Sequence, residues 1–299
     1  MQGYHLENCT VDKLFSENNI SLSVLRLDKI HPVVSGNKLF KLHYFIEATL
    51  RSTHKTILTF GGAYSNHLVA TAFACRQAGL NSIGIIRGEK PEILSATLQH
   101  CKEYGMQLEF ISREKYQQKE TEFFLQDLKK GFGECTIIPE GGYHPLGASG
   151  AGLIMDLVAE ESFSHVCTAS GTATTLAGLL LKSNAHQQII SIPVLKGMND
   201  TIQRLAYLTP NNIKEKQLTV FDEYHFGGYA KKTNELLSFM NKLWQQHQLP
   251  TDFVYTAKMF YAVYDKIHSG FFHSGSNILC IHTGGLQGNV SLPSGTLNF

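Results

Sequence analysis

Apolar positions along the chain follow two alternating patterns. Short, mainly apolar runs, which are typical of buried strands, are separated by longer stretches in which apolar residues recur with helical spacing. The predicted strands span residues 22–27, 56–60, 82–87, 107–111, 136–138, 165–169, 189–193 and 277–282. The predicted helices span residues 39–51, 68–78, 93–104, 121–129, 147–160, 176–183, 201–207, 231–247 and 257–268.

This alternation predicts an α/β fold with open, mostly parallel twisted sheets and helices on both faces. The glycine-rich stretch 139–152 is the best candidate boundary between a first and a second set of strand–helix units. In open α/β folds the ligand binds beyond the carboxyl ends of the strands. The loops that directly follow the strands are therefore where we expect the chemistry.

Composition and charge narrow the class of protein. The 299 residues are enough for about two domains. Lys and Arg number 26 and Asp and Glu 25, so charge gives no reason to expect nucleic acid or an anionic membrane as a partner. We expect no secretory leader and no membrane-spanning helix, because the first residues lack a basic region followed by an apolar one and no apolar run is long enough to span a membrane. Its six cysteines lie far apart, which predicts reduced thiols, a cytoplasmic location and no metal site.

Three predicted strands run into loops that combine glycine with small polar residues. These loops are Gly61-Gly62-Ala63-Tyr64-Ser65-Asn66-His67, Ser170-Gly171-Thr172-Ala173-Thr174-Thr175 and Thr283-Gly284-Gly285. Glycine lets a ligand approach the backbone, and the N-terminus of a following helix attracts an anion. The threonine-rich loop suits a phosphate, although its hydroxyls could equally cap a buried helix. Likewise, Ser65-Asn66-His67 could either cap a helix or bind a substrate carboxylate.

A lysine near these loops adds a further possibility. Lys38 lies at the start of a predicted helix, in Gly36-Asn37-Lys38-Leu39. Such a lysine is usually a solvated charge. A lysine beside an anion-binding loop is also what a Schiff base to an aldehyde cofactor requires.

Five motifs in order resemble a known family. They are Gly36-Asn37-Lys38-x-x-Lys41-Leu42, Gly61-Gly62-x-x-Ser65-Asn66-His67, Pro139-Glu140-Gly141-Gly142, Ser170-Gly171-Thr172-x-x-Thr175-x-Ala177-Gly178 and His282-Thr283-Gly284-Gly285. This order resembles the 1-aminocyclopropane-1-carboxylate deaminase/D-cysteine desulfhydrase family. Its members are pyridoxal 5'-phosphate (PLP) enzymes with the tryptophan synthase β-like fold, fold type II. The resemblance extends over about residues 21–288.

The resemblance implies specific roles for residues of this chain. Lys38 would form the Schiff base with PLP, and Lys41 would point toward the phosphate. The loop of Thr172, Ala173, Thr174 and Thr175 would hold that phosphate. Asn66 would bind the phenolic oxygen of the cofactor, and Ser65 would be a catalytic hydroxyl. Ser65, Asn66 and the backbone N–H of His67 would bind the substrate carboxylate. Tyr229 and Tyr255 would be the two active-site tyrosines.

The resemblance also implies which reaction is favoured. Thr256 occupies a position that is Glu in the ring-opening deaminases, and Thr283 replaces an apolar residue of those enzymes. Both threonines would lie near the pyridine nitrogen, where a hydroxyl can leave the ring neutral. We therefore expect D-cysteine desulfhydrase-type elimination, giving pyruvate, ammonia and hydrogen sulfide, with Lys38 or Ser65 as the α-proton base. The alternatives are 1-aminocyclopropane-1-carboxylate deaminase activity, giving 2-oxobutyrate and ammonia, and a PLP-binding protein with little turnover.

The family architecture implies two domains. Residues 1–40 plus 146–299 would form the large PLP-binding domain, and residues 41–145 would form a small α/β domain that closes over the cofactor. The partners implied are a small amino-acid substrate and a second copy of the chain in a homodimer. Two departures from the family pattern stand out: Arg26-Leu27-Asp28-Lys29, and Ala173-Thr174 where desulfhydrases commonly have two glycines.

Overall fold

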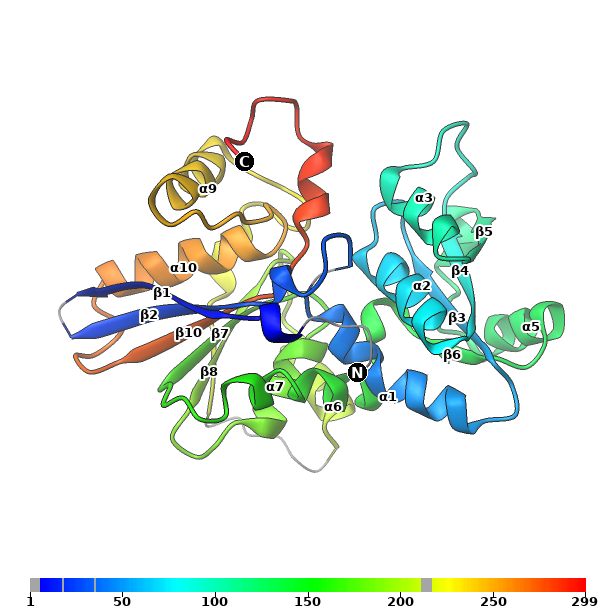
Figure 1. Cartoon of the computed structure of the whole chain (residues 1–299), viewed down its shortest axis with the longest axis horizontal. Coiled ribbons are helices and arrows are strands. Elements are labelled where there is room, and N and C mark those ends of the chain that lie inside the picture. Colours follow the sequence, from blue (N-terminus) through cyan, green and yellow to red (C-terminus); the bar gives the residue numbers. More distant parts are fainter. Residues whose placement is uncertain (1–5, 18, 35, 211–216) are drawn as a thin grey trace.

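The molecule consists of two lobes, each built around its own sheet (Figure 1). The computed structural model describes residues 6–17, 19–34, 36–210 and 217–299. The larger lobe has a six-stranded sheet with the order β1-β2-β10-β7-β8-β9, and the smaller lobe has a four-stranded sheet with the order β5-β4-β3-β6. Every strand pair except β1–β2 is parallel. The predicted fold class is thus confirmed.

The strands agree closely with the predicted apolar runs. They span Val11–Glu17 (β1), Ile20–Arg26 (β2), Thr56–Gly61 (β3), Asn81–Arg87 (β4), Gln107–Ile111 (β5), Thr136–Ile138 (β6), His165–Ser170 (β7), Gln188–Pro193 (β8), Leu218–Val220 (β9) and Asn277–His282 (β10). Two of them, β1 and β9, were not predicted. Both are edge strands; Asp12, Lys13 and Glu17 interrupt the apolar pattern of β1, and β9 is only three residues long.

Helices cover both faces of the larger sheet (Figure 1). They span Lys38–Arg51 (α1), Asn66–Ala78 (α2), Ala96–Glu103 (α3), Arg113–Tyr116 (α4), Glu122–Phe132 (α5), Pro145–Gly152 (α6), Thr174–Lys182 (α7), Thr201–Leu208 (α8), Asn234–His247 (α9) and Thr256–His268 (α10). In Figure 1, α9 and α10 lie above the sheet, and α6 and α7 lie below it.

Three predicted helices are shorter in the structure, among them the one predicted over 231–247, which begins at Asn234. The helix predicted over 147–160 ends at Gly152 and is followed by a separate 3-10 helix, Met155–Val158. Its glycines favour helix weakly. The helix predicted over 93–104 begins only at Ala96, because the Ser95 hydroxyl caps it by accepting from the N–H of Leu98 at 3.2 Å.

The two sheets draw their strands from different parts of the chain. All strands of the four-stranded sheet lie within 41–145, and all strands of the six-stranded sheet lie within 1–40 and 146–299. The exact domain boundaries stay a prediction, since α1 begins at Lys38 and runs from one range into the other.

Glycines bring α6 and α7 into close contact beneath the larger sheet. A Cβ atom placed on Gly178 would lie 2.5 Å from the carbonyl oxygen of Ala148 and 2.5 Å from the nitrogen of Gly152. We expect Gly178→Ala to push the helices apart and to lower the free energy of unfolding by about 1–3 kcal/mol, as overpacking does. The midpoint of urea-induced unfolding measures this.

Gly131 in α5 provides the matched control. It is exposed, and a Cβ atom there would meet no heavy atom within 4 Å. Gly131→Ala should therefore leave the midpoint unchanged or raise it, by up to about 1 kcal/mol. Equal midpoints for wild type and Gly178→Ala would contradict the close helix packing.

Candidate functional site

Direct contacts join the loops that the sequence singles out. The side chain of Asn37, just before α1, donates from Nδ2 to Oγ1 of Thr175 at 2.7 Å. The backbone N–H of Asn37 donates to the carbonyl of Thr283 at 3.3 Å. A Cβ atom on Gly285 would lie 3.3 Å from Nδ2 of Asn66. The loops after β3, β7 and β10 therefore meet at the start of α1, at the carboxyl ends of the strands.

The threonine-rich loop turns sharply into α7. Ala173 is buried and has φ +61°, and α7 begins at the next residue, Thr174. The hydroxyl groups of Thr172 and Thr174 lie 2.9 Å apart, and Thr174 and Thr175 are buried. A left-handed conformation costs a non-glycine residue about 1–2 kcal/mol, and such strain gathers at loops that bind ligands. Glycine would adopt the conformation of Ala173 without that cost.

Two lysines of α1 are enclosed at the same place. Nζ of Lys38 donates to Oδ1 of Asn37 at 2.9 Å, and Nζ of Lys41 donates to the carbonyl of Gly141 at 3.3 Å. Burial lowers the pKa of Lys38 to about 8, while the charge of Asp252 acts in the opposite direction. Burial, and then the charge of Lys38, hold the pKa of Lys41 well below its ordinary value. Among the described residues no carboxylate forms an ion pair with either lysine.

The start of α2 borders the lysines. Ser65 caps this helix, with Oγ accepting from the N–H of Leu68 at 3.4 Å. Asn66 and His67 form the first turn, so their N–H groups belong to the unpaired set at a helix start. A Cβ atom on Gly142 would lie 3.4 Å from Cβ of Lys41 and 3.9 Å from Cε1 of His67, which places the imidazole beside the lysine.

The protonation of His67 follows from its partners. The hydroxyl of Thr59 donates to the carbonyl of Ile138 at 2.8 Å, so it accepts from Nε2 of His67 at 2.9 Å. Burial, and then the charges of Lys38 and Lys41, lower the pKa of His67 to about 3. The ring is therefore neutral.

The two tyrosines that the resemblance implied lie together. Their ring centroids are 6.0 Å apart at an interplanar angle of 74°, an edge-to-face contact. Tyr229 is 55% exposed, whereas burial and the neighbouring Tyr229 raise the pKa of Tyr255 well above its ordinary value. A Cβ atom on Gly171 would lie 3.3 Å from Cε1 of Tyr255. The pair thus borders the threonine-rich loop.

A buried carboxylate that the sequence reasoning missed, Asp252, organises the start of α10. Its Oδ1 accepts from the N–H groups of Val254 and Tyr255 at 2.9 and 2.8 Å. Its Oδ2 accepts from the N–H and the hydroxyl of Thr256 at 3.0 and 2.7 Å. A Cβ atom on Gly285 would lie 3.3 Å from the same Oδ2. Asp252 four residues before Thr256, at the start of a predicted helix, is a capping signal that could have found it.

The two threonines expected near a pyridine nitrogen differ in their hydrogen bonds. The hydroxyl of Thr256 is committed to Asp252, since it donates to Oδ2 and also accepts from the Asp252 N–H at 2.8 Å. Thr283 is buried in the loop after β10, and its hydroxyl makes no hydrogen bond to any described residue. Of the two hydroxyl groups, that of Thr283 is therefore the one whose proton is available for a hydrogen bond to a pyridine nitrogen.

Comparisons with known proteins agree with this geometry. A family model described as "Pyridoxal-phosphate dependent enzyme" matches residues 9–284. The chain belongs to this family. A Pyrococcus abyssi protein named "Putative 1-aminocyclopropane-1-carboxylate deaminase" is 30% identical over 92% of this chain and 88% of its own length. A D-cysteine desulfhydrase of Serratia proteamaculans is 26% identical over 87% of this chain and 86% of its own. The solved structure of an "ACC deaminase homologue" superimposes with a TM-score of 0.78 at 27% identity, covering 94% of this chain and 90% of that one.

The residues of this PLP-dependent enzyme fit the cofactor. The partly buried Lys38 and the buried Lys41, neither of them paired with a carboxylate, form a site that needs an anion, and the N-terminus of α7 offers backbone N–H groups and hydroxyls to a phosphate. The lowered pKa of Lys38 gives a substantial neutral fraction, which a Schiff base requires. The assignment of each residue to cofactor or substrate stays a prediction.

A titration tests the environment of Lys38. Because only the neutral amine attacks the cofactor aldehyde, the rate at which free PLP combines with the apo-protein should rise with pH and level off above about 8. Below that pH it should fall by about tenfold per unit. Reaction of PLP with Nα-acetyl-lysine corrects for titration of the cofactor itself. A rate that still climbs steeply above pH 9 would show that Lys38 is solvated.

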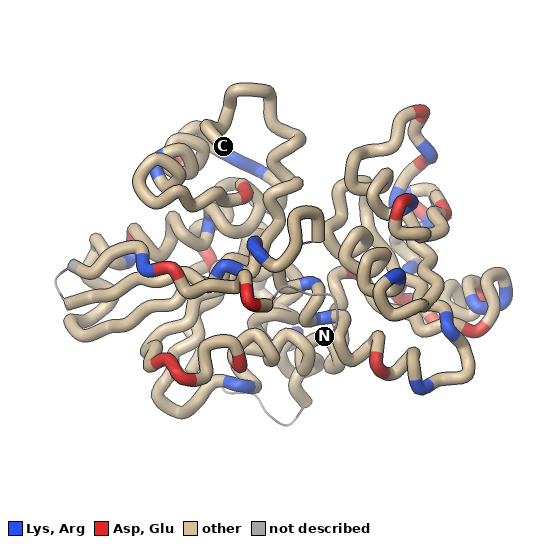
Figure 2. The backbone as a smooth tube through the Cα atoms, viewed as in Figure 1, with Lys and Arg blue, Asp and Glu red and all other residues tan. Residues whose placement is uncertain are grey.

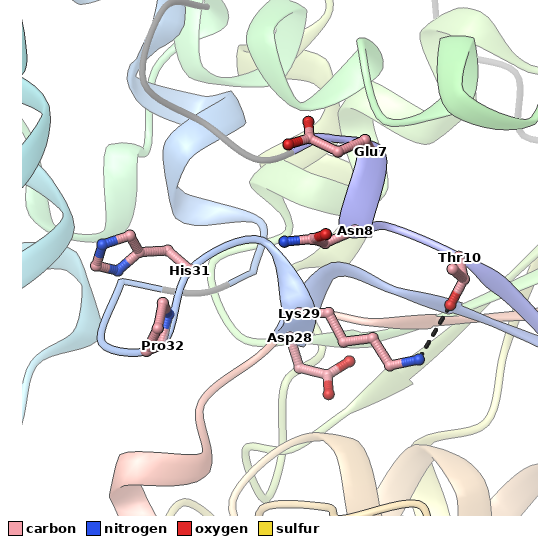
Figure 3. A pocket seen from close by; sticks show the side chains of 7 residues that line it. All are labelled: Glu7, Asn8, Thr10, Asp28, Lys29, His31 and Pro32. Carbon is pink, nitrogen blue, oxygen red and sulfur yellow. Dashed lines mark hydrogen bonds between the residues drawn. The ribbon is translucent and has the colours of Figure 1, made fainter.

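A surface depression lies away from the predicted site residues. A depression of about 500 Å³ lies against the N-terminal segment, and the residues that line it include Thr10, Asp28 and Lys29 (Figure 3). Asp28 is already paired with Arg26 at 2.7 Å. None of the predicted site residues lines this depression.

Neither the charged side chains nor the potential metal ligands of the described residues form a second candidate site. Lys and Arg are interspersed with Asp and Glu over both lobes (Figure 2). Within the described ranges, no three His, Cys, Asp or Glu side chains are grouped as metal ligands would be. Within the same ranges, no helix has the length and apolar character to cross a membrane.

Proposed function

We propose that this PLP-dependent enzyme catalyses the α,β-elimination of D-cysteine or a closely related β-substituted alanine. Cysteine and one water give pyruvate, ammonia and hydrogen sulfide. The observation that carries the proposal is the pair of threonines, Thr256 and Thr283, where the ring-opening deaminases are expected to have Glu and an apolar residue. Elimination of a good leaving group needs less electron withdrawal by the cofactor than ring opening does.

The family resemblance implies the proposed roles of the residues, and their contacts support them. When bound, PLP supplies an electron sink for the substrate's α-carbon. Lys38 would hold the cofactor covalently, Lys41 and the loop 172–175 would hold its phosphate, and Asn66 would hold its phenolic oxygen. The first-turn N–H groups of α2, with Ser65, would bind the substrate carboxylate. The α-proton would pass to Nζ of Lys38 after the substrate amine has displaced it from the cofactor, or to Oγ of Ser65 after loss of the hydroxyl proton, and Tyr229 and Tyr255 would enclose the β-substituent.

The two lobes suit such a reaction. Lys38 begins α1 and the loop 172–175 follows β7 of the larger sheet, whereas Ser65, Asn66 and His67 follow β3 of the smaller one. We infer that closure of the small lobe brings the carboxylate-binding turn onto a substrate held at Lys38 and excludes water. A homodimer and a cytoplasmic location stay predictions.

Substrate assays test the proposed function. The PLP-loaded protein is incubated separately with D-cysteine, L-cysteine and 1-aminocyclopropane-1-carboxylate, and sulfide, pyruvate and 2-oxobutyrate are measured against PLP without protein. We expect sulfide and pyruvate in equal amounts from D-cysteine. Only 2-oxobutyrate from the cyclopropane substrate would establish the deaminase that the Pyrococcus relative's name describes. Spectral change without any product would leave a PLP-binding protein.

A pair of variants tests which threonine faces the ring nitrogen. We expect Thr283→Val to shift the visible absorption of the holoenzyme and to lower kcat by about 2–10-fold, the value of one lost hydrogen bond between neutral groups. Thr256→Val should leave the absorption unchanged and lower the free energy of unfolding by about 1–2 kcal/mol through loss of its hydrogen bonds with Asp252. The opposite pattern of spectra would assign the ring nitrogen to Thr256.

A further inference from the structure

The segment that carries Tyr229 has a strained backbone. Phe226, Gly227, Gly228 and Ala230 have φ values of +50°, +92°, +118° and +53°. Two of these four residues are not glycine, and the left-handed region disfavours them. Such a run persists only where surrounding contacts hold it in place.

Lys258 makes those contacts from the first turn of α10. Its side chain is fully buried, and its Nζ donates to the carbonyls of His225 and Gly228 at 2.9 and 2.8 Å. These two carbonyls bracket the strained residues 226 and 227 and end directly before Tyr229. Among the described residues no carboxylate forms an ion pair with Lys258. Its ammonium group instead donates hydrogen bonds to the two carbonyl groups.

The same helical turn carries the partner of Tyr229. Tyr255 precedes Lys258 by three residues at the start of α10, and its ring meets that of Tyr229 edge to face. Tyr229 itself is more than half exposed, so burial alone does not fix its position. Lys258 thus connects, through one helical turn, the two aromatic rings that border the threonine-rich loop.

We propose that Lys258 is a positioning residue that fixes Tyr229 against Tyr255 by holding the carbonyls of His225 and Gly228. Only the catalytic consequence of this inference rests on the proposed function, because the proposed function is what places Tyr229 at the β-substituent. Lys258 touches neither cofactor nor substrate in this assignment; it acts through the 225–230 segment.

Hydrogen–deuterium exchange of the PLP-loaded protein tests the holding of the segment. Lys258→Met keeps a long apolar stem and removes the donors. We expect exchange in peptides covering 226–231 to accelerate by at least about tenfold, as the loss of charge-assisted hydrogen bonds allows, while β7 exchanges as in wild type. Unchanged exchange in 226–231, or acceleration throughout the larger lobe, would overturn the proposal.

Lys266 on the same helix is the matched control. It pairs with Glu223 at 2.9 Å and lies over the rings of Phe221 and Tyr224, so it contacts the neighbouring 3-10 helix Asp222–His225. It donates to neither of the two carbonyls. Lys266→Met, with the same loss of charge, should leave exchange in 226–231 at the wild-type rate. Equal acceleration in both variants would show a general effect of charge on α10.

A double-mutant cycle tests the catalytic consequence. If Lys258 acts through Tyr229, the kcat of Lys258→Met/Tyr229→Phe should lie within about twofold of that of Tyr229→Phe alone, with KM little changed. Losses of kcat that multiply would overturn the positioning role. Failure of the proposed function shows separately, as a wild-type protein that forms no sulfide, and the exchange experiment then still decides whether Lys258 holds the segment.

Discussion

Replacement of Lys38 by alanine is expected to abolish turnover and to remove the visible absorption band of the PLP-loaded protein. Lys38 is the lysine at the start of α1 whose amine lies beside the threonine-rich loop, through Asn37 and Thr175. Its pKa of about 8 leaves a reactive neutral fraction at physiological pH. We expect kcat to fall by at least about a thousandfold, as for removal of a covalent catalyst. Absorption spectra and a single-turnover assay measure both effects.

Lys41→Met serves as the matched control for this variant. It removes the amine of the second lysine of the site, which is buried one helical turn away. If Lys41 holds the phosphate, this variant should bind PLP about 10–100-fold more weakly and should still show the visible band at saturating PLP. Persistence of the band at full intensity in Lys38→Ala would mean that another lysine forms the Schiff base.

Replacement of Asp252 by asparagine is expected to have the second-largest effect. The two carboxylate oxygens accept four hydrogen bonds from Val254, Tyr255 and Thr256. An asparagine amide would turn one acceptor into a donor that faces the N–H and the hydroxyl of Thr256. It would also remove the negative charge that raises the pKa of Lys38 and of Lys258. We expect a loss of about 3–5 kcal/mol in the free energy of unfolding, as for a broken buried charge network.

An exposed aspartate at another helix start provides the comparison. Asp200 precedes α8 and pairs with Arg204 at 2.8 Å, but it is half exposed and its side chain makes no capping hydrogen bond. Asp200→Asn should lower the free energy of unfolding by less than about 1 kcal/mol. Denaturation curves of the two variants measured side by side are informative, because equal losses would show that the Asp252 network contributes no more than a surface ion pair.

The loops of the site could be found from sequence because their signals are local. Glycine followed by Ser, Thr or Asn at the end of an apolar run marks a strand that turns into a helix start, and the loops after β3 and β7 both have this form. Lys38 carried no such signal by itself. Only its order among five motifs distinguished it from a solvated lysine, because the contact of Asn37 with Thr175 joins residues 138 positions apart.

Other features depended on tertiary contacts that no local pattern encodes. The mixed polarity of Val11–Glu17 does not indicate a strand. This segment is extended because it pairs with β2 at the edge of the sheet. Asp252 reads as a simple helix cap, and only the fold brings its carboxylate to Gly285 and toward Lys38. The same holds for Lys258, which contacts carbonyls about 30 residues earlier in the chain. The hydrogen bonds of Thr256 distinguish it from Thr283, a difference that residue type alone does not show.

Chemical labelling tests most directly whether Lys38 holds the cofactor. The PLP-loaded protein is treated with borohydride, which makes the link between cofactor and lysine permanent, and the digested peptides are mapped by mass spectrometry. The arrangement of α1 and the threonine-rich loop predicts one phosphopyridoxyl group per chain, on Lys38. A label on Lys41, on Lys258 or on a surface lysine, with Lys38 unmodified, would contradict the proposed site.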